Sequence, residues 1–191
     1  MLEAAEKERR KLAAEARGVA VGIAPAGAEG TRSWTSHLRA DLVDRLMDDQ
    51  ARMMIMEEDG WVQVREVPPD ALELNARLDR AADGACTLFY DVTATLHCKC
   101  TQMRGTWSDP GAMSFDVVVK LSKVDNATSS EDWIAEAEMG DEVFATPRVQ
   151  KMMNEYVRPR YLPHVKGLLE ASIERLKSSA LSSIGDPKEL N

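Results

Sequence analysis

The sequence of 191 residues contains few of the residue types that most often carry catalysis or bind metal. It has three histidines and three cysteines, and it holds no Gly-rich phosphate loop, no GxSxG pattern and no HExxH pattern. The cysteines are close together, and their odd number does not suit a disulfide framework. We therefore expect reduced thiols, no cofactor and no enzyme active site.

The run His97-Cys98-Lys99-Cys100 brings metal-binding residue types together. In a strand, Cys98 and Cys100 share one face, while His97 points to the other face. A closed zinc site needs four ligands, and no second pair of Cys or His stands at a suitable spacing. We interpret these cysteines, together with Cys86, as buried thiols and expect no metal site.

The sequence also lacks any run of about 20 apolar residues, the length that a membrane-spanning helix needs. Residues 1–17 carry charged side chains where a secretory signal would need an apolar segment. The net charge is -8 and the pI is near 5, which argues against binding to nucleic-acid phosphates and permits a basic protein partner. We expect a cytoplasmic protein that binds neither nucleic acid nor membrane.

The first 30 residues differ in composition from the rest of the chain. Residues 1–17 are charged and poor in apolar side chains, and residues 18–30 are rich in Gly and Ala. Both patterns indicate flexible segments, an N-terminal extension followed by a linker. The remaining length suffices for one domain with a sizeable core, which we place at residues 31–185, before a short tail at residues 186–191.

A long strand pattern lies at residues 86–98 (CTLFYDVTATLHC), which are rich in β-branched and aromatic residues and free of Gly and Pro. Because strand side chains alternate between two faces, one face belongs on a core. That face consists of Cys86, Leu88, Tyr90, Val92, Ala94, Leu96 and Cys98. The other face is polar except for Phe89, a large aromatic on the side predicted to face water.

Further alternating segments predict a small sheet. Residues 61–67 and 71–78 alternate on either side of a Pro-Pro-Asp turn, which indicates two strands or one bent strand. Asp-Gly at the end of residues 79–84 predicts a hairpin turn into the long strand. Residues 113–124 alternate again, and residues 101–107 fit a short additional strand. Short connections between these segments favour an antiparallel meander of about four strands.

Residues 31–49 predict an N-terminal helix. Trp34, Leu38 and Leu42 recur at helical spacing, and Ser33 is the expected N-cap. The opposite face of this helix is acidic and includes Asp44 and Asp48.

The C-terminal part of the sequence predicts an acidic loop and two helices. Residues 125–142 hold seven acidic residues and no Lys or Arg, which we interpret as a solvated loop with one helical turn. Thr146 and Pro147 fit the N-cap and first position of a helix that Pro159 should stop or kink. The longer helix that follows has a continuous apolar stripe from Val165 to Ala180, which needs a flat partner. The predicted fold class is therefore α+β, an antiparallel meander packed on a long C-terminal helix, with an N-terminal helix.

In this order, the elements resemble the N-terminal domain of the family of activators of heat-shock protein 90 ATPase. The resemblance rests on LFYDV in the long strand, FDVVVKLSK in the next strand, the acidic loop, and VQKMMNEYVRPRYLPHVKGLLEASIERLKS in the terminal helices. It covers roughly residues 31–180. It implies a non-enzymatic, monomeric co-chaperone that binds the middle segment of heat-shock protein 90 and modulates its ATPase, with stimulation as the expected effect.

The resemblance also implies a contact surface, because the solvent face of the aromatic strand meets the chaperone in this family. The candidate partner-binding residues are Phe89, Asp91, Thr87, Arg77, Arg80, Glu73, Asp44 and Asp48. Arg77 and Arg80 would replace a basic cluster that the family carries before this strand, where the present sequence reads AADGA. The family's N-terminal Asn/Trp motif and its second domain have no counterpart in these residues.

Two other functions fit the same elements. A curved sheet that grips a long helix can enclose a cavity, so a carrier of a small ligand is one alternative. A well-enclosed apolar cavity between sheet and helix would favour that function. An adaptor for another basic protein partner is the second alternative, suggested by the acidic charge.

Overall fold

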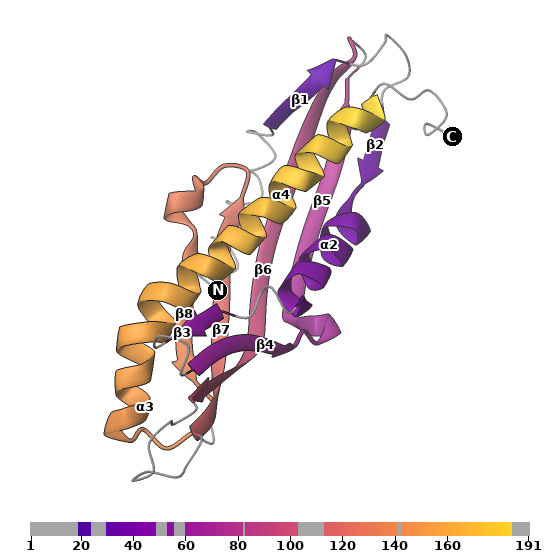
Figure 1. Cartoon of the computed structure of the whole chain (residues 1–191). Helices are drawn as coiled ribbons and strands as arrows, with labels where there is room; N and C mark the ends of the chain where they lie inside the picture. The colour runs from indigo at the N-terminus through magenta and orange to yellow at the C-terminus, as the bar shows by residue number, and fades with distance from the viewer. Residues whose placement is uncertain are drawn as a thin grey trace, which may run out of the picture.

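We describe the fold from a computed structural model that defines residues 19–23, 30–48, 53–55, 60–81, 83–102, 113–140 and 143–184. Within these residues an antiparallel sheet is covered on one face by a long C-terminal helix and a shorter N-terminal helix (Figure 1). The predicted α+β fold class is confirmed.

The sheet is built around strand β6 (Ala85–Gln102), which has 18 residues and is longer than predicted. One edge of β6 pairs first with β5 (Leu72–Arg80) and then with β4 (Gly60–Glu66). The other edge pairs with β1 (Val19–Ile23) and then with β7 (Met113–Asp125). β6 therefore holds both halves of the sheet together.

The alternation predicted for β6 is confirmed, because its even-numbered side chains from Cys86 to Cys100 are all buried. The buried face of β7 is confirmed as well, with Phe115, Val117, Val119 and Leu121 in the core. Branched and aromatic side chains at every second position fit a pleated surface with one buried face.

Three outer strands complete an eight-stranded sheet in the described part of the chain. β2 (Gly30–Ser33) pairs with β5, β3 (Met53–Ile55) pairs with β4, and β8 (Ile134–Met139) pairs with β7. The prediction of about four strands was too low. Most of residues 101–107, expected as a short strand, lie outside the described residues, and Thr101 and Gln102 belong to the end of β6.

Two of the unpredicted strands lie in segments that were expected to be irregular. β8 lies inside the acidic stretch 125–142, where its acidic side chains occupy the solvent face and Ala137 is buried. The predicted helical turn in that stretch is the 3-10 turn η3 (Ser130–Asp132). β1 lies inside the expected linker 18–30, where its backbone pairs with β6. The sheet thus begins before residue 31, and residues 1–18 lie outside the described residues.

The connections around β5 follow the turn chemistry in the sequence. The Pro-Pro-Asp segment forms the 3-10 turn η2 (Pro69–Ala71), so β4 and β5 are two separate strands. In the β5–β6 hairpin, Gly84 has a φ of 87°, a left-handed conformation that favours glycine. The N–H of Ala85 donates to Oδ1 of Asp83 at 2.9 Å, and the predicted hairpin is confirmed.

The N-terminal helix α2 (Thr35–Met47) is shorter than predicted. Its buried residues Leu38, Leu42 and Leu46 form the expected apolar stripe. The prediction of Ser33 as N-cap was wrong, because Ser33 is the last residue of β2 and the N-cap position is Trp34.

The two predicted C-terminal helices form one continuous helical run. It consists of α3 (Pro147–Met152), the π-helical segment η4 (Met153–Tyr161) and α4 (Leu162–Ile184). Thr146 caps it as predicted, since its Oγ1 accepts from the N–H of Val149 at 3.3 Å. Pro159 does not stop the run. The wider π-helical turns accommodate a residue that lacks an N–H and would clash in an ordinary α-helix.

The apolar stripe of α4 packs across the sheet (Figure 1). Its residues Val165, Leu169, Ile173, Leu176 and Ala180 are all buried. α2 lies beside α4 on the same face, so neither helix covers the opposite face, which we call the open face. No helix in the described residues is long and apolar enough to cross a membrane.

Candidate partner-binding face

The predicted contact residues of β6 lie on the open face of the sheet. Thr87 and Phe89 are half-buried there, and Asp91 is exposed. Their strand neighbours Leu88 and Tyr90 are buried beneath the helices. The alternation of β6 therefore places Thr87, Phe89 and Asp91 on one surface, as predicted, while their role in binding stays a prediction.

Phe89 is partly covered by Arg77 of the neighbouring strand. The two residues are directly opposite in the β5–β6 register, and Cζ of Arg77 lies 4.7 Å from the ring centroid of Phe89. Nε of Arg77 also lies 3.2 Å from Oδ2 of Asp79. A guanidinium at this distance from a ring is attracted by its electron-rich face. The pair forms a composite aromatic and cationic patch, which explains how a large ring is accommodated on the open face.

A hollow of about 300 Å³ lies next to this patch. It is lined by Arg39, Leu72, Glu73, Leu74, Asn75, Asp91 and Thr93. The structure thus brings two predicted residues, Glu73 and Asp91, to one site. Arg39 reaches the hollow from α2 and donates to the carbonyl of Leu72 at 2.7 Å. No sequence pattern singled out Arg39, because its place depends on how α2 packs along the sheet edge.

Arg80 does not belong to this face. It stands opposite Cys86 in the register, three positions from Arg77, so the two arginines are on opposite sides of β5. Leu78, with the same parity as Arg80, is buried against the helices. The hypothesis that both arginines together replace the basic cluster is therefore not supported by their placement. The alternation of β5 was already visible in the sequence and could have excluded Arg80.

Asp44 and Asp48 are also remote from the open face. Both belong to the helix layer, where Asp48 follows the last residue of α2 and Asp44 lines a second hollow. The acidic helix face and the acidic residues of the sheet are therefore two separate surfaces.

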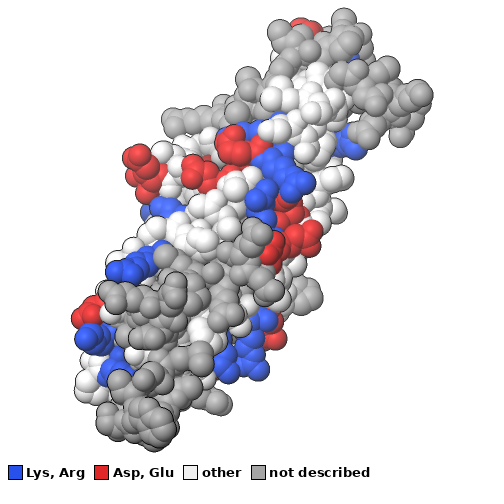
Figure 2. All heavy atoms as spheres, viewed as in Figure 1, with Lys and Arg blue, Asp and Glu red and all other residues white. Residues whose placement is uncertain are grey.

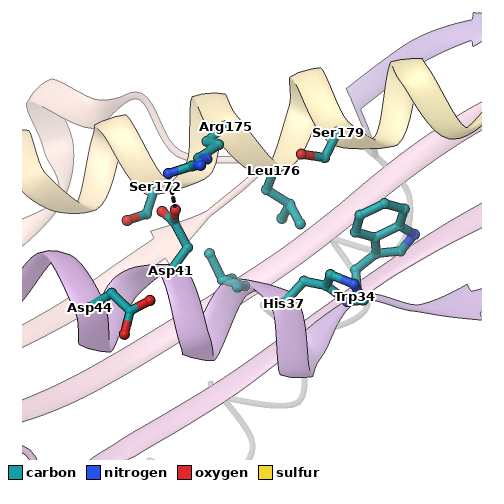
Figure 3. A pocket seen from close by; sticks show the side chains of 9 residues that line it. Trp34, His37, Asp41, Asp44, Ser172, Arg175, Leu176 and Ser179 are labelled. Carbon is teal, nitrogen blue, oxygen red and sulfur yellow. Dashed lines mark hydrogen bonds and ion pairs between the residues drawn. The ribbon is translucent and has the colours of Figure 1, made fainter.

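The second hollow, of about 250 Å³, lies between α2 and α4 (Figure 3). It is lined by Trp34, His37, Leu38, Asp41, Asp44, Ser172, Arg175, Leu176 and Ser179. Acidic and basic atoms adjoin over this part of the helix layer (Figure 2). Both hollows are open to solvent and lined by charged side chains, so neither is the enclosed apolar cavity that a ligand carrier would use.

Asp41 joins the two helices. Its Oδ2 accepts from Nε of Arg45 at 2.8 Å, and its Oδ1 accepts from Arg175 of α4 at 3.0 Å (Figure 3). Burial alone would raise the pKa of Asp41, but the hydrogen bond from Arg45, with contributions from Ser172 and Arg175, outweighs it and lowers the pKa below its ordinary value. Asp41 is thus an ionised link between α2 and α4.

The cysteines are buried on the core face of β6, as predicted. Burial raises the pKa of Cys100 to about 12. Burial also raises the pKa of Cys98 to about 11, although a hydrogen bond with Tyr161 opposes the rise. Sγ of Cys98 lies 3.6 Å from the Tyr161 hydroxyl. Across the described residues, no three or more His, Cys, Asp or Glu side chains are grouped so that they could hold a metal ion.

The chain resembles known proteins in its fold. No protein-family model matches the chain, and no curated protein matches it. Among solved structures, the solution structure of the human Aha1 N-terminal domain is similar, with a TM-score of 0.52 and 14% sequence identity. The match covers 80% of this chain and 99% of that one. At this identity the likeness concerns the fold, and the chain shares its fold with the N-terminal domain of human Aha1.

Proposed function

We propose that this chain is a co-chaperone domain that binds the middle segment of heat-shock protein 90 and modulates its ATPase. The observation that carries the proposal is the combination of the fold shared with the human Aha1 N-terminal domain and the patch on its open face. The sequence resemblance and the shared fold both support this proposal.

The chemistry of the open face suits a protein partner. Aromatic and arginine side chains are common anchors in protein interfaces, and the patch of Phe89 and Arg77 supplies one of each. The carboxylates of Glu73 and Asp91 line the adjoining hollow. The net charge of -8 favours encounter with a basic surface.

The proposed mechanism needs no catalytic residue in this domain. A partner that binds one conformation of an ATPase better than another raises the population of the preferred conformation. A difference of about 1.4 kcal/mol changes that ratio tenfold. In this proposal the domain is not an enzyme, and the chaperone itself performs the hydrolysis.

The chain lacks the basic cluster of the family, and this difference affects how strongly we expect the ATPase to be stimulated. Of the two arginines near the missing basic cluster, Arg77 alone is on the open face. The hairpin turn with Gly84 occupies the position of the cluster itself. We therefore expect binding to persist with weaker stimulation of the ATPase.

The test is a calorimetric titration of the full chain into the isolated middle segment of heat-shock protein 90 at low ionic strength. The proposal predicts a dissociation constant in the range of tens of micromolar or tighter. Absence of binding under these conditions would reject it and leave the adaptor and carrier functions. A coupled ATPase assay with the intact chaperone then measures whether binding stimulates hydrolysis.

A further inference from the structure

The outer edge of β5 is only partly covered by other strands. β2 pairs with residues 77–80 of β5 and ends at Ser33. The N–H of Trp34 then donates to the carbonyl of Ala76 at 2.7 Å. Because the backbone groups of a strand alternate between its two edges, Leu72, Leu74 and Ala76 all direct their N–H and C=O groups to this outer edge.

Side chains of helix α2 bond to both backbone groups of Ala76 and to the carbonyl of Leu72. Oγ1 of Thr35 accepts from the N–H of Ala76 at 3.0 Å and lies 3.2 Å from its carbonyl oxygen, to which it donates. The guanidinium of Arg39 donates to the carbonyl of Leu72 at 2.7 Å. Thr35 and Arg39 thus replace part of a neighbouring strand.

Leu74 lies between these two covered positions. Among the residues that the structure describes, none bonds to the outward N–H or C=O of Leu74. Its side chain packs partly against the core, and the residue lines the hollow that contains Asp91 and Glu73. An unpaired donor and acceptor on a strand edge are a template for pairing with another chain.

We propose that Leu74 is a backbone docking point for an extended segment of the protein partner. The segment accepts from the N–H of Leu74 and donates to its carbonyl, as in strand addition to a sheet edge. This inference rests on the proposed function and identifies the kind of partner segment that the site takes.

The short distance between Leu72 and Ala76 limits which partner segment can pair with Leu74. From Leu72 to Ala76 the edge spans about 13 Å at ~3.3 Å per residue, and both ends are occupied by α2 side chains. One residue of an extended segment therefore fits as the pairing residue. A helix does not fit this role, because its own backbone groups are already bonded. The adjoining hollow carries both signs of charge, the carboxylates of Glu73 and Asp91 and the guanidinium of Arg39, so the backbone bonds and not charge define the segment.

The direct test is amide hydrogen exchange, measured by nuclear magnetic resonance on the full chain alone and saturated with the middle segment of heat-shock protein 90. In the free chain, the Leu74 amide should exchange at least tenfold faster than the Ala76 amide, which is bonded to Thr35. In the complex, exchange at Leu74 should slow at least tenfold. Protection of Leu74 in the free chain, or unchanged exchange at Leu74 in a saturated complex, would overturn the inference.

A pair of variants tests the same bond through affinity. Leu74→Pro removes the N–H, and because that N–H is on the outer edge, the pairing with β6 does not need it. Leu74→Ala is the matched control, since it truncates the side chain and keeps the N–H. We expect Leu74→Pro to bind at least tenfold more weakly than Leu74→Ala. Equal affinities of the two folded variants would overturn the inference.

The two proposals fail in different ways. If the wild-type chain does not bind the middle segment, the proposed function is rejected and the docking point with it. If the wild-type chain binds while Leu74 stays unprotected, the proposed function stands and only the docking point is rejected. Should Leu74→Pro not fold, the exchange measurement on the wild-type chain decides alone.

Discussion

The guanidinium carbon of Arg77 lies 4.7 Å from the centre of the Phe89 ring, and the two residues are opposite each other on β5 and β6. This contact shields one side of an aromatic ring on a sheet face that α2 and α4 do not cover. It also keeps a positive charge beside the hollow that contains Asp91. The same pair therefore links the stability of this face to the binding that we propose for it.

Removing the Arg77 side chain should have a small effect on folding. We expect Arg77→Ala to lower the free energy of unfolding by about 0.5–1 kcal/mol, the range of a cation–π contact at a partly exposed site. Urea denaturation measures this difference. Phe89→Ala in the Arg77→Ala background completes a double-mutant cycle. A coupling energy of zero between the two residues would show that the contact does not stabilise the fold.

Neutralising Asp41 should loosen the link between α2 and α4 in a pH-dependent way. Because the pKa of Asp41 in the folded chain is below its ordinary value of 3.8, the ionised form stabilises the fold above that value. The stabilisation is lost as the pH falls through the folded-state pKa. We expect Asp41→Asn to cost up to about 1 kcal/mol at pH 7 and much less once the pH is below the folded-state pKa of Asp41.

Denaturation of wild type and Asp41→Asn at a series of pH values provides the measurement. Asp44→Asn is the control, since this substitution removes the same charge from the same helix. A cost for Asp41→Asn that is independent of pH would contradict the ionised link.

The buried thiols should be inert in the folded chain. Because burial raises the pKa of Cys98 to about 11 and that of Cys100 to about 12, very little thiolate forms at pH 8. We expect neither residue to react with iodoacetamide at pH 8 until the chain is unfolded in denaturant. Mass spectrometry of the labelled chain checks this. Rapid native labelling of Cys98 or Cys100 would show that the core face of β6 opens.

The buried apolar side chains of α4 should contribute far more to stability than the exposed ones. Leu169 is fully buried, so Leu169→Ala is expected to cost about 2–5 kcal/mol through lost burial and a residual cavity. Leu181 is 50% exposed on the same helix, so Leu181→Ala should change stability by less than about 0.5 kcal/mol. Thermal and chemical denaturation of both variants compare the two positions. Similar costs would contradict the packing of α4 on the sheet.

The sequence predicted those elements in which side-chain periodicity reports burial directly. The alternation in β6 and β7 and the spacing in α2 and α4 each match the buried faces in the structure. β8 was missed because its alternate residues are acidic or small, which reads as a solvated loop. β1 was missed because its Gly and Ala residues give little pattern, while its pairing with β6 depends on backbone bonds.

The candidate site was predictable to the extent that it follows from strand alternation. The pattern of β6 identified Phe89 and Asp91 as neighbours on one face, and the same rule applied to β5 separates Arg77 from Arg80. The hollow and the role of Arg39 were not predictable, because they depend on the packing of α2 against the edge of β5. Pairwise register and helix placement are tertiary features that no local pattern encodes.

The most direct test of the central claim compares equal charge changes on the two faces of the molecule. The double variant Phe89→Ala/Asp91→Lys alters the open face, and Asp44→Lys makes the same charge change in the helix layer. Both are titrated against the middle segment of heat-shock protein 90 beside the wild-type chain, with melting temperatures recorded.

We predict that the double variant binds at least tenfold more weakly, by about 1.4 kcal/mol, while its melting temperature falls by only the few degrees that loss of the Arg77 contact explains, and that Asp44→Lys binds as the wild-type chain does. Unchanged affinity of the double variant, or an equal loss of affinity in Asp44→Lys, would contradict binding through the open face.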